Sequence, residues 1–310
     1  MKKPILILIV TLHYLSCYTQ DDYSWWNIKH DYDGVSSWMK YIIYSPSYMG
    51  PNALPVPDVS KGYFNDKYFV DLGTVYHFSG GDRTFNFISV FNLPVAPGRA
   101  GVLISYVPVE FYETDTVTRD MRRARDYFPS GHSFGDFYLT TYLQVIKNHG
   151  SLPDVMLTIN LKTASGTNLR NARNTDAPGY YFDASASKKF FTGYEKLEWI
   201  RPFAMAGFYC YQTNYYKYTQ NDAFLYGAGM EFGFRHFVLE TEVGGYIGYF
   251  NLGDKPMVYR LELRSQGEKP AGYRLFFQRG LNDFPFTSFG FSFFLNYRMP
   301  GWFGGERTSF

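Results

Sequence analysis

A serine between two glycines is the first feature of the sequence that could do chemistry. Residues 131–135 read Gly-His-Ser-Phe-Gly, which is the Gly-x-Ser-x-Gly spacing of the nucleophile elbow in α/β-hydrolases. Such an elbow needs a buried strand before the serine and a helix after it, but Pro129 precedes this motif and an alternating, strand-like run follows it. On a strand, the adjacent His132 and Ser133 point to opposite faces. The sequence therefore predicts no catalytic residue, and a lipid-modifying enzyme stays open only as an alternative.

One polar connection is rich in arginine. It contains Arg119, Arg122, Arg123 and Arg125, with Asp120 and Asp126 interleaved. Guanidinium groups bind phosphates and carboxylates through paired hydrogen bonds. We interpret this connection as a candidate anion-contact loop, for lipopolysaccharide phosphates or an anionic solute. A solvated loop or an internal arginine–carboxylate network is the alternative.

Charges of both signs alternate with apolar residues near the C-terminus. The charged positions are Glu240, Glu242, Arg260, Glu262, Arg264 and Arg274. Period-two spacing puts them on the face opposite an apolar stripe, and opposite charges on neighbouring strands can pair. The pattern predicts an ion-paired network on an inner wall. Together with the aromatic residues Tyr138, Tyr142, Tyr246 and Phe276, it predicts a narrow lumen rather than a wide, water-filled one.

These side chains need long strands to position them. Alternation runs over eight or more residues, as in Val155, Leu157, Ile159 and Leu161, whose neighbours are polar. We predict twelve strands, near 68–79, 83–95, 100–114, 132–147, 153–163, 178–190, 198–213, 222–235, 237–250, 256–267, 271–281 and 286–298. Soluble sandwiches use strands of about five or six residues, so these runs favour a transmembrane antiparallel β-barrel.

The connections also fit a membrane barrel, which has short turns at one end and long loops at the other. The connections at 80–82, 235–236 and 267–270 are tight, whereas those at 115–131, 164–177 and 214–221 are long and polar. Of the 310 residues, 21% are aromatic and 19% charged, which excludes disorder and is unusual for a soluble α/β enzyme.

The N-terminus has the layout of a secretory signal peptide over residues 1–19, with Lys2 and Lys3 before an apolar stretch. Cleavage there leaves 30 − 2 = 28 basic against 28 acidic residues, so no charge argument for nucleic acid remains. Cys17 sits where a lipoprotein cysteine could sit, in a poor match to that signal. The six histidines lack metal-ligand spacing and Cys210 is the only other cysteine, so we expect no metal and no cofactor.

Residues 20–66 differ from the rest of the chain. They contain Trp25 and Trp26, and then four prolines at 46, 51, 55 and 57, a density that excludes a central strand. We expect this Pro/Trp-rich segment to plug the barrel or cover its mouth. The barrel itself is predicted over 67–298, with a C-terminal tail over 299–310.

Two stretches resemble known membrane barrels. Residues 288–295, Ser-Phe-Gly-Phe-Ser-Phe-Phe-Leu, resemble the assembly signal on the last strand of Gram-negative outer-membrane barrels, although a tail follows here. The stretch from about 130 to 190 resembles a channel-like outer-membrane family linked to aromatic-compound degradation clusters. It contains Gly135-Asp136, Pro153-Asp154 and Lys162 through Gly166 in the order of that family's pattern.

The sequence as a whole predicts an all-β protein, a barrel of about twelve strands in the bacterial outer membrane. The function we expect is a narrow channel for small solutes, not an enzyme. The first alternative is a structural or accessory barrel of a larger outer-membrane assembly, and the second is the lipid-modifying enzyme above. The expected partners are outer-membrane lipid, lipopolysaccharide and other outer-membrane proteins, with no nucleic acid.

Overall fold

The computed structural model describes residues 22–214, 219–248, 254–266 and 270–297. The signal peptide, Cys17 and the C-terminal tail predicted from the sequence lie outside this part of the chain. The chain divides into two compact units, Met1–Ser36 and Ser37–Phe310. In the first unit a short helix, α2 (Ser24–Lys29), buries Trp26, whose ring contacts those of His30 and Tyr32. None of the helices in the described residues is long and apolar enough to cross a membrane.

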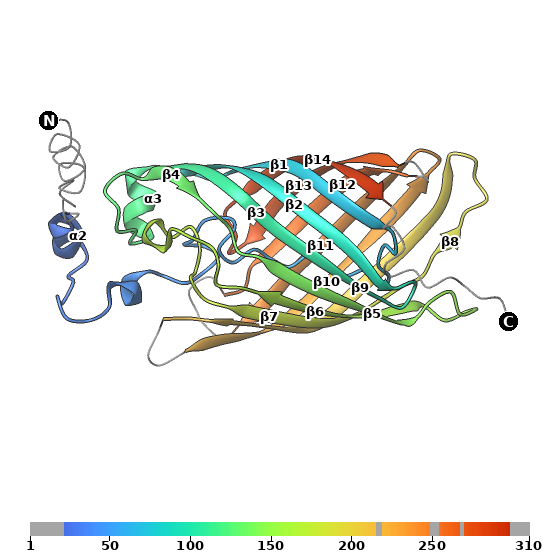
Figure 1. Cartoon of the computed structure of the whole chain (residues 1–310), viewed down its shortest axis with the longest axis horizontal. Helices are drawn as coiled ribbons and strands as arrows, with labels where there is room; N and C mark the ends of the chain where they lie inside the picture. The colour runs from blue at the N-terminus through green and yellow to red at the C-terminus, as the bar shows by residue number, and fades with distance from the viewer. Residues whose placement is uncertain (1–21, 215–218, 249–253, 267–269, 298–310) are drawn as a thin grey trace, which may run out of the picture. The chain divides into compact units, whose positions relative to one another are not determined.

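The second unit is a closed antiparallel barrel (Figure 1). Fourteen strands occur in the described residues, and twelve of them form the ring, because β4 pairs only with β3 and β8 only with β9. The ring runs in chain order from β1 to β14 and closes through the pairing of β14 with β1. Closure leaves no free sheet edge in the ring, as a membrane-spanning sheet requires. The strand bounds are β1 Tyr68–Phe78, β2 Asp82–Ala96, β3 Ala100–Thr114, β4 Ser130–Ser133, β5 Tyr138–Ile146, β6 Asp154–Lys162, β7 Gly179–Ser187, β8 Phe190–Phe191, β9 Leu197–Gln212, β10 Gln220–Phe234, β11 Phe237–Gly248, β12 Met257–Ser265, β13 Ala271–Asn282 and β14 Thr287–Tyr297.

The two faces of the wall differ as the alternation predicts. On β6, Leu157, Ile159 and Leu161 are exposed while Thr158 and Asn160 between them are buried. On β14 the exposed residues are Phe289, Phe291, Phe293 and Leu295, whereas Ser288 and Ser292 are buried. An outer wall this apolar is stable only against hydrocarbon, whereas an apolar patch of this extent is rare on soluble proteins.

One strand and one connection differ from the sequence prediction. The run predicted at 132–147 is broken into β4 and β5 at residues 134–137, because Gly135 donates to the carbonyl of Val107 and Asp136 turns inward to Lys162. The tight turn near 80–82 lies at the same end as the long connections 115–137 and 163–178. The short turns are therefore not all at one end of the barrel, contrary to the sequence prediction. We call this end of the barrel the loop end and the opposite end, where β1 begins and β14 ends, the turn end.

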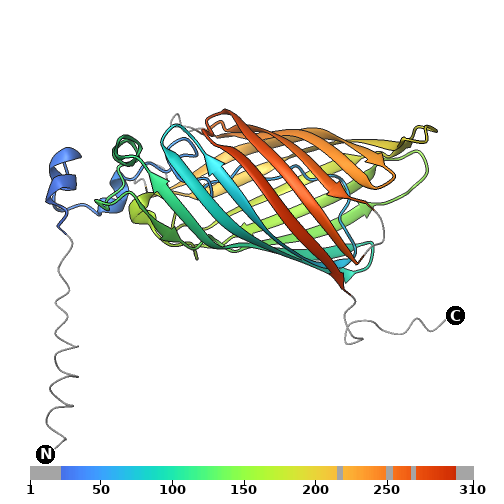
Figure 2. The same cartoon turned by 90° about the horizontal axis from the view of Figure 1, so that it is seen from above.

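A chain segment occupies the lumen. It starts with a 3-10 helix, η1 (Trp38–Tyr41), at the loop end, where the Arg125 guanidinium lies 5.2 Å from the Trp38 ring. It then passes along the inside of the wall, as the blue chain in Figures 1 and 2 shows. At the turn end Asn92 on β2 donates to the carbonyls of Asn65 and Lys67, just before β1 begins. We call residues 37–67 the lumen segment.

Candidate functional site

Side chains of the wall make hydrogen bonds with the backbone of the lumen segment. Four prolines keep it irregular, so its polar groups need partners outside the segment. Arg260 donates to the carbonyls of Val56 and Pro57, at 2.5 and 3.2 Å. At Gly62 the amide donates to Ser185 and the carbonyl accepts from Gln144, at 3.0 and 2.7 Å. The wall therefore holds this segment at several depths along the barrel.

The turn-end half of the inner wall carries a row of three glutamates. Strand register places Glu231, Glu240 and Glu262 directly beside one another on β10, β11 and β12. Like charges in this arrangement repel each other unless cations lie between them. Arg264 pairs with all three, at 2.7 Å from Glu240 and 3.3 Å from Glu262, and its contact with Glu231 is also close. Lys61 of the lumen segment supplies a second cation, 2.5 Å from Glu240.

Two further arginines extend this row. Arg260 pairs with Glu242 at 2.9 Å, and Arg274 pairs with Asp71 at 3.1 Å and with Glu262 at 3.7 Å. The structure thus brings together the six residues singled out in the sequence, namely Glu240, Glu242, Arg260, Glu262, Arg264 and Arg274. Their charges are used both to join neighbouring strands and to hold the lumen segment, through Arg260.

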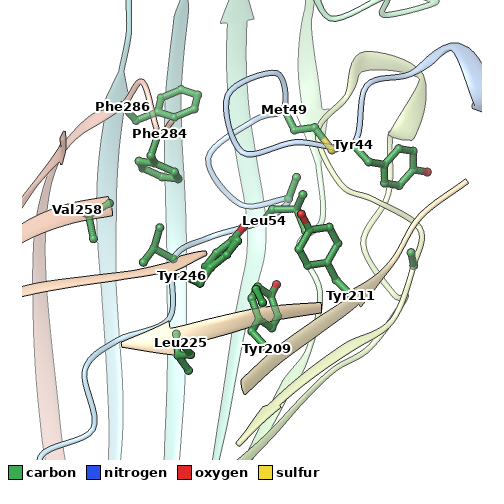
Figure 3. Close-up of a cluster of buried hydrophobic side chains, with 14 of the residues drawn as sticks. Tyr44, Met49, Leu54, Tyr209, Tyr211, Leu225, Tyr246, Val258, Phe284 and Phe286 are labelled. Atoms are coloured by element: carbon green, nitrogen blue, oxygen red, sulfur yellow. The ribbon is translucent and has the colours of Figure 1, made fainter. Parts of the chain in front are cut away.

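An apolar cluster lies in the loop-end half of the lumen. Figure 3 shows Tyr44, Met49 and Leu54 of the lumen segment among Tyr209, Tyr211, Tyr246 and Leu225 of the wall. Tyr246 and Leu225 are 0% exposed, as is Phe286 next to β14. Aromatic rings from the wall and side chains from the lumen segment fill this half of the barrel in the conformation described.

A buried arginine closes the loop end. Arg173, in the connection between β6 and β7, lies 2.6 Å from Asp82 and 2.6 Å from Glu110, on β2 and β3. It also donates to the Thr84 hydroxyl at 2.7 Å. Burial disfavours the charged form of Arg173, but the two carboxylates outweigh burial and raise the pKa of its guanidinium above the ordinary value. The ion pairs fasten the 163–178 connection over the mouth.

The four arginines of the predicted anion-contact loop lie in different surroundings. Arg122 is buried and pairs with Asp82 at 2.5 Å, beside Arg173. Arg119 pairs with Asp120 and donates to the carbonyl of Tyr127. Arg123 is exposed, and Arg125 lies over Trp38. The four do not converge on one surface, and Arg122 belongs to the internal network that was the alternative interpretation.

The Ser133 hydroxyl faces inward and donates to Glu110 at 2.6 Å, whereas His132 beside it is exposed. The arrangement lacks the serine–histidine contact of a hydrolase. Among the described residues no three His, Cys, Asp or Glu side chains are grouped as metal ligands.

Several important residues were not singled out in the sequence. Glu231 and Arg201 lie on alternating strands, so the period-two rule could have found them. Lys61 and Tyr63 lie in an irregular segment, and Arg173 lies in a long connection. No periodicity predicts where such side chains point.

No protein-family model matches the chain, and no curated protein sequence matches it. Among solved structures, an outer-membrane channel from Pseudomonas putida F1 is similar, with 10% identity and a TM-score of 0.54 over 78% of this chain and 100% of that one. The KdgM porin has 7% identity and a TM-score of 0.45, over 74% of this chain and 99% of the other. The transport unit of the autotransporter AIDA-I from Escherichia coli has 9% identity and a TM-score of 0.46, over 83% and 100%. The first likeness, with the closed ring and the apolar outer wall, shows that this chain has the fold of a bacterial outer-membrane β-barrel.

Proposed function

We propose that this protein is a narrow outer-membrane channel for small solutes, and that its lumen segment sets the width of the pore. The observation that carries the proposal is the course of residues 37–67, which pass through the lumen from the loop end to the turn end. Polar and charged wall residues line the turn-end half, as a path for water-soluble solutes needs, and the loop-end half holds both an apolar cluster and the buried ion pairs of Arg173. A wide general porin would leave its lumen open to water.

The proposal is supported by how the segment is held. Its anchors are single side-chain contacts, such as Lys61 with Glu240 and Arg260 with two carbonyls, rather than strand pairing with the wall. Contacts of this kind can be broken one at a time without opening the ring of strands. The barrel and its occupant are thus separable parts.

Solute uptake into liposomes tests the proposal. We expect proteoliposomes of the mature chain to swell slowly in small solutes and not in large ones. Lys61→Met should speed uptake, because it removes the cation between the segment and Glu240. Lys196→Met is the matched control, since Lys196 is an exposed lysine of the 188–196 connection at the same end. An absence of uptake by both wild type and Lys61→Met would contradict the channel and favour an accessory, structural barrel.

A further inference from the structure

A cavity at the turn end lies between the lumen segment and the wall. Its volume is about 310 Å³, and its lining includes Tyr63, Lys189, Trp199, Arg201, Val238 and Arg264. Three of these six are cations, and no acidic residue of the described chain is among those that line the cavity. We call it the turn-end pocket.

Two of the cations have unused hydrogen-bonding capacity. Arg201 lies with its guanidinium carbon 3.9 Å from the Tyr63 ring centre, and its nearest carboxylate, Glu231, is 3.9 Å away, beyond hydrogen-bond distance. Its Nε is buried and has no hydrogen-bond partner within the described chain. Lys189 lies 4.2 Å from the Trp199 ring centre. A buried arginine nitrogen without a partner costs free energy, and an anion in the pocket would supply the partner.

The neighbouring acids Glu231 and Glu240 make their shortest ion pairs with other cations. Glu231 already pairs with Arg264 and accepts a hydrogen bond from the Tyr63 hydroxyl at 2.6 Å. Glu240 pairs with Lys61 and Arg264. The ammonium of Lys189 and the guanidinium of Arg201 therefore offer donors that no carboxylate of the described residues holds at hydrogen-bond distance.

The pocket also has an apolar side. Trp199 and Val238 are buried, at 7% and 4% exposure. Trp199 lies flat against β10 because residue 233 is glycine, where a Cβ atom would lie 1.9 Å from the indole. A ligand that fits needs an anionic group for the cations and an apolar body for these two side chains.

We infer that the turn-end pocket is a binding site for small organic carboxylates with an apolar body. A carboxylate accepts from a guanidinium through two parallel hydrogen bonds, and a neighbouring ammonium adds a third donor. The inference rests on the proposed function and extends it. The site lies at one mouth of the proposed channel, and its side chains define the class of solute that binds there. Binding itself requires no flux through the barrel.

Calorimetric titration of the full mature chain, refolded in detergent, tests the inference. The probes are benzoate and benzamide, which differ in charge and little in shape. We expect benzoate to bind and benzamide not to bind. Arg201→Gln and Lys189→Gln should each weaken benzoate binding by about ten-fold or more, the usual effect of losing a charged hydrogen bond. Lys147→Gln, a cation at the same end but outside the pocket, should bind as wild type does.

Equal binding of the two probes, or wild-type affinity in both pocket variants, would overturn the site. Heat-modifiable migration on gels verifies that each variant is folded. Lys189 lies in a turn outside the ring, so Lys189→Gln should not disturb folding. If Arg201→Gln does not fold, the benzoate affinity of Lys189→Gln tests the site. Benzoate binding without solute uptake would contradict the channel function and support the binding site. Solute uptake without benzoate binding would support the channel function and contradict the binding site.

Discussion

Arg260 both joins neighbouring strands and holds the lumen segment inside the barrel. The same guanidinium pairs with Glu242 on the next strand and donates to two carbonyls of the lumen segment. Glu242 is only 5% exposed, so losing its partner leaves a carboxylate in a poorly solvated place. An unpaired buried charge costs far more than an exposed one.

We therefore predict that Arg260→Ala lowers the free energy of unfolding by about 3 kcal/mol or more. Urea titration of the refolded barrel measures this change. Lys147→Ala breaks an exposed pair and should cost about 0 to 1 kcal/mol. Adding Glu242→Gln to Arg260→Ala should restore part of the loss, because it removes the orphaned charge. Equal stability of Arg260→Ala and wild type would mean that water solvates these residues independently in a wide pore.

At the scale of strands, most of the fold could be predicted from the sequence. All twelve predicted strands correspond to strands of the ring, because a wall with lipid outside and polar groups inside imposes a period of two on every strand. The exception is 132–147, where Gly135 and Asp136 interrupt the strand through contacts with β3 and Lys162 that alternation cannot reveal. The contacts of Lys61 and Arg173 could not be predicted either, because irregular chain has no period that fixes side-chain direction.

The outward stripe on β6 gives a direct prediction. Ile159 is 47% exposed on the apolar outer wall, so Ile159→Arg should cost about 2 to 4 kcal/mol near the middle of the bilayer. The yield of folded, heat-modifiable barrel in lipid vesicles measures this cost. Val117→Arg, at an exposed site in α3 (Thr116–Met121) of the long connection, is the control and should fold normally. Similar yields for the two variants would contradict the assignment of the lipid face.

The 163–178 connection is a second element with a testable role. Arg173→Gln should release it from the barrel mouth, because it removes both ion pairs and leaves Asp82 and Glu110 buried. We expect faster cleavage within this connection by added proteinase K, which does not require an arginine at the cleavage site, and a less stable barrel. Arg170→Gln, in the same connection but with a half-exposed side chain, should be cleaved at the wild-type rate. Protection of the Arg173 variant at the wild-type level would show that other contacts hold the connection.

At the scale of the whole molecule, the protein consists of a ring of strands and a segment of its own chain inside it. The ring accounts for insertion in the membrane through its apolar outer face. The lumen segment accounts for the polar and charged inner wall, since the wall side chains are its hydrogen-bond and ion-pair partners. In the channel that we propose, the width of the pore depends on the lumen segment rather than on the number of strands.

Single-channel conductance in planar bilayers tests this account most directly, by comparing the mature wild type with a variant that lacks residues 21–66. The account predicts a small conductance for the wild type and a several-fold larger one for the deletion variant, with both migrating as folded barrels. Lys61→Met should lie between the two. The same conductance in wild type and deletion variant would contradict the central claim that residues 37–67 set the width of the pore.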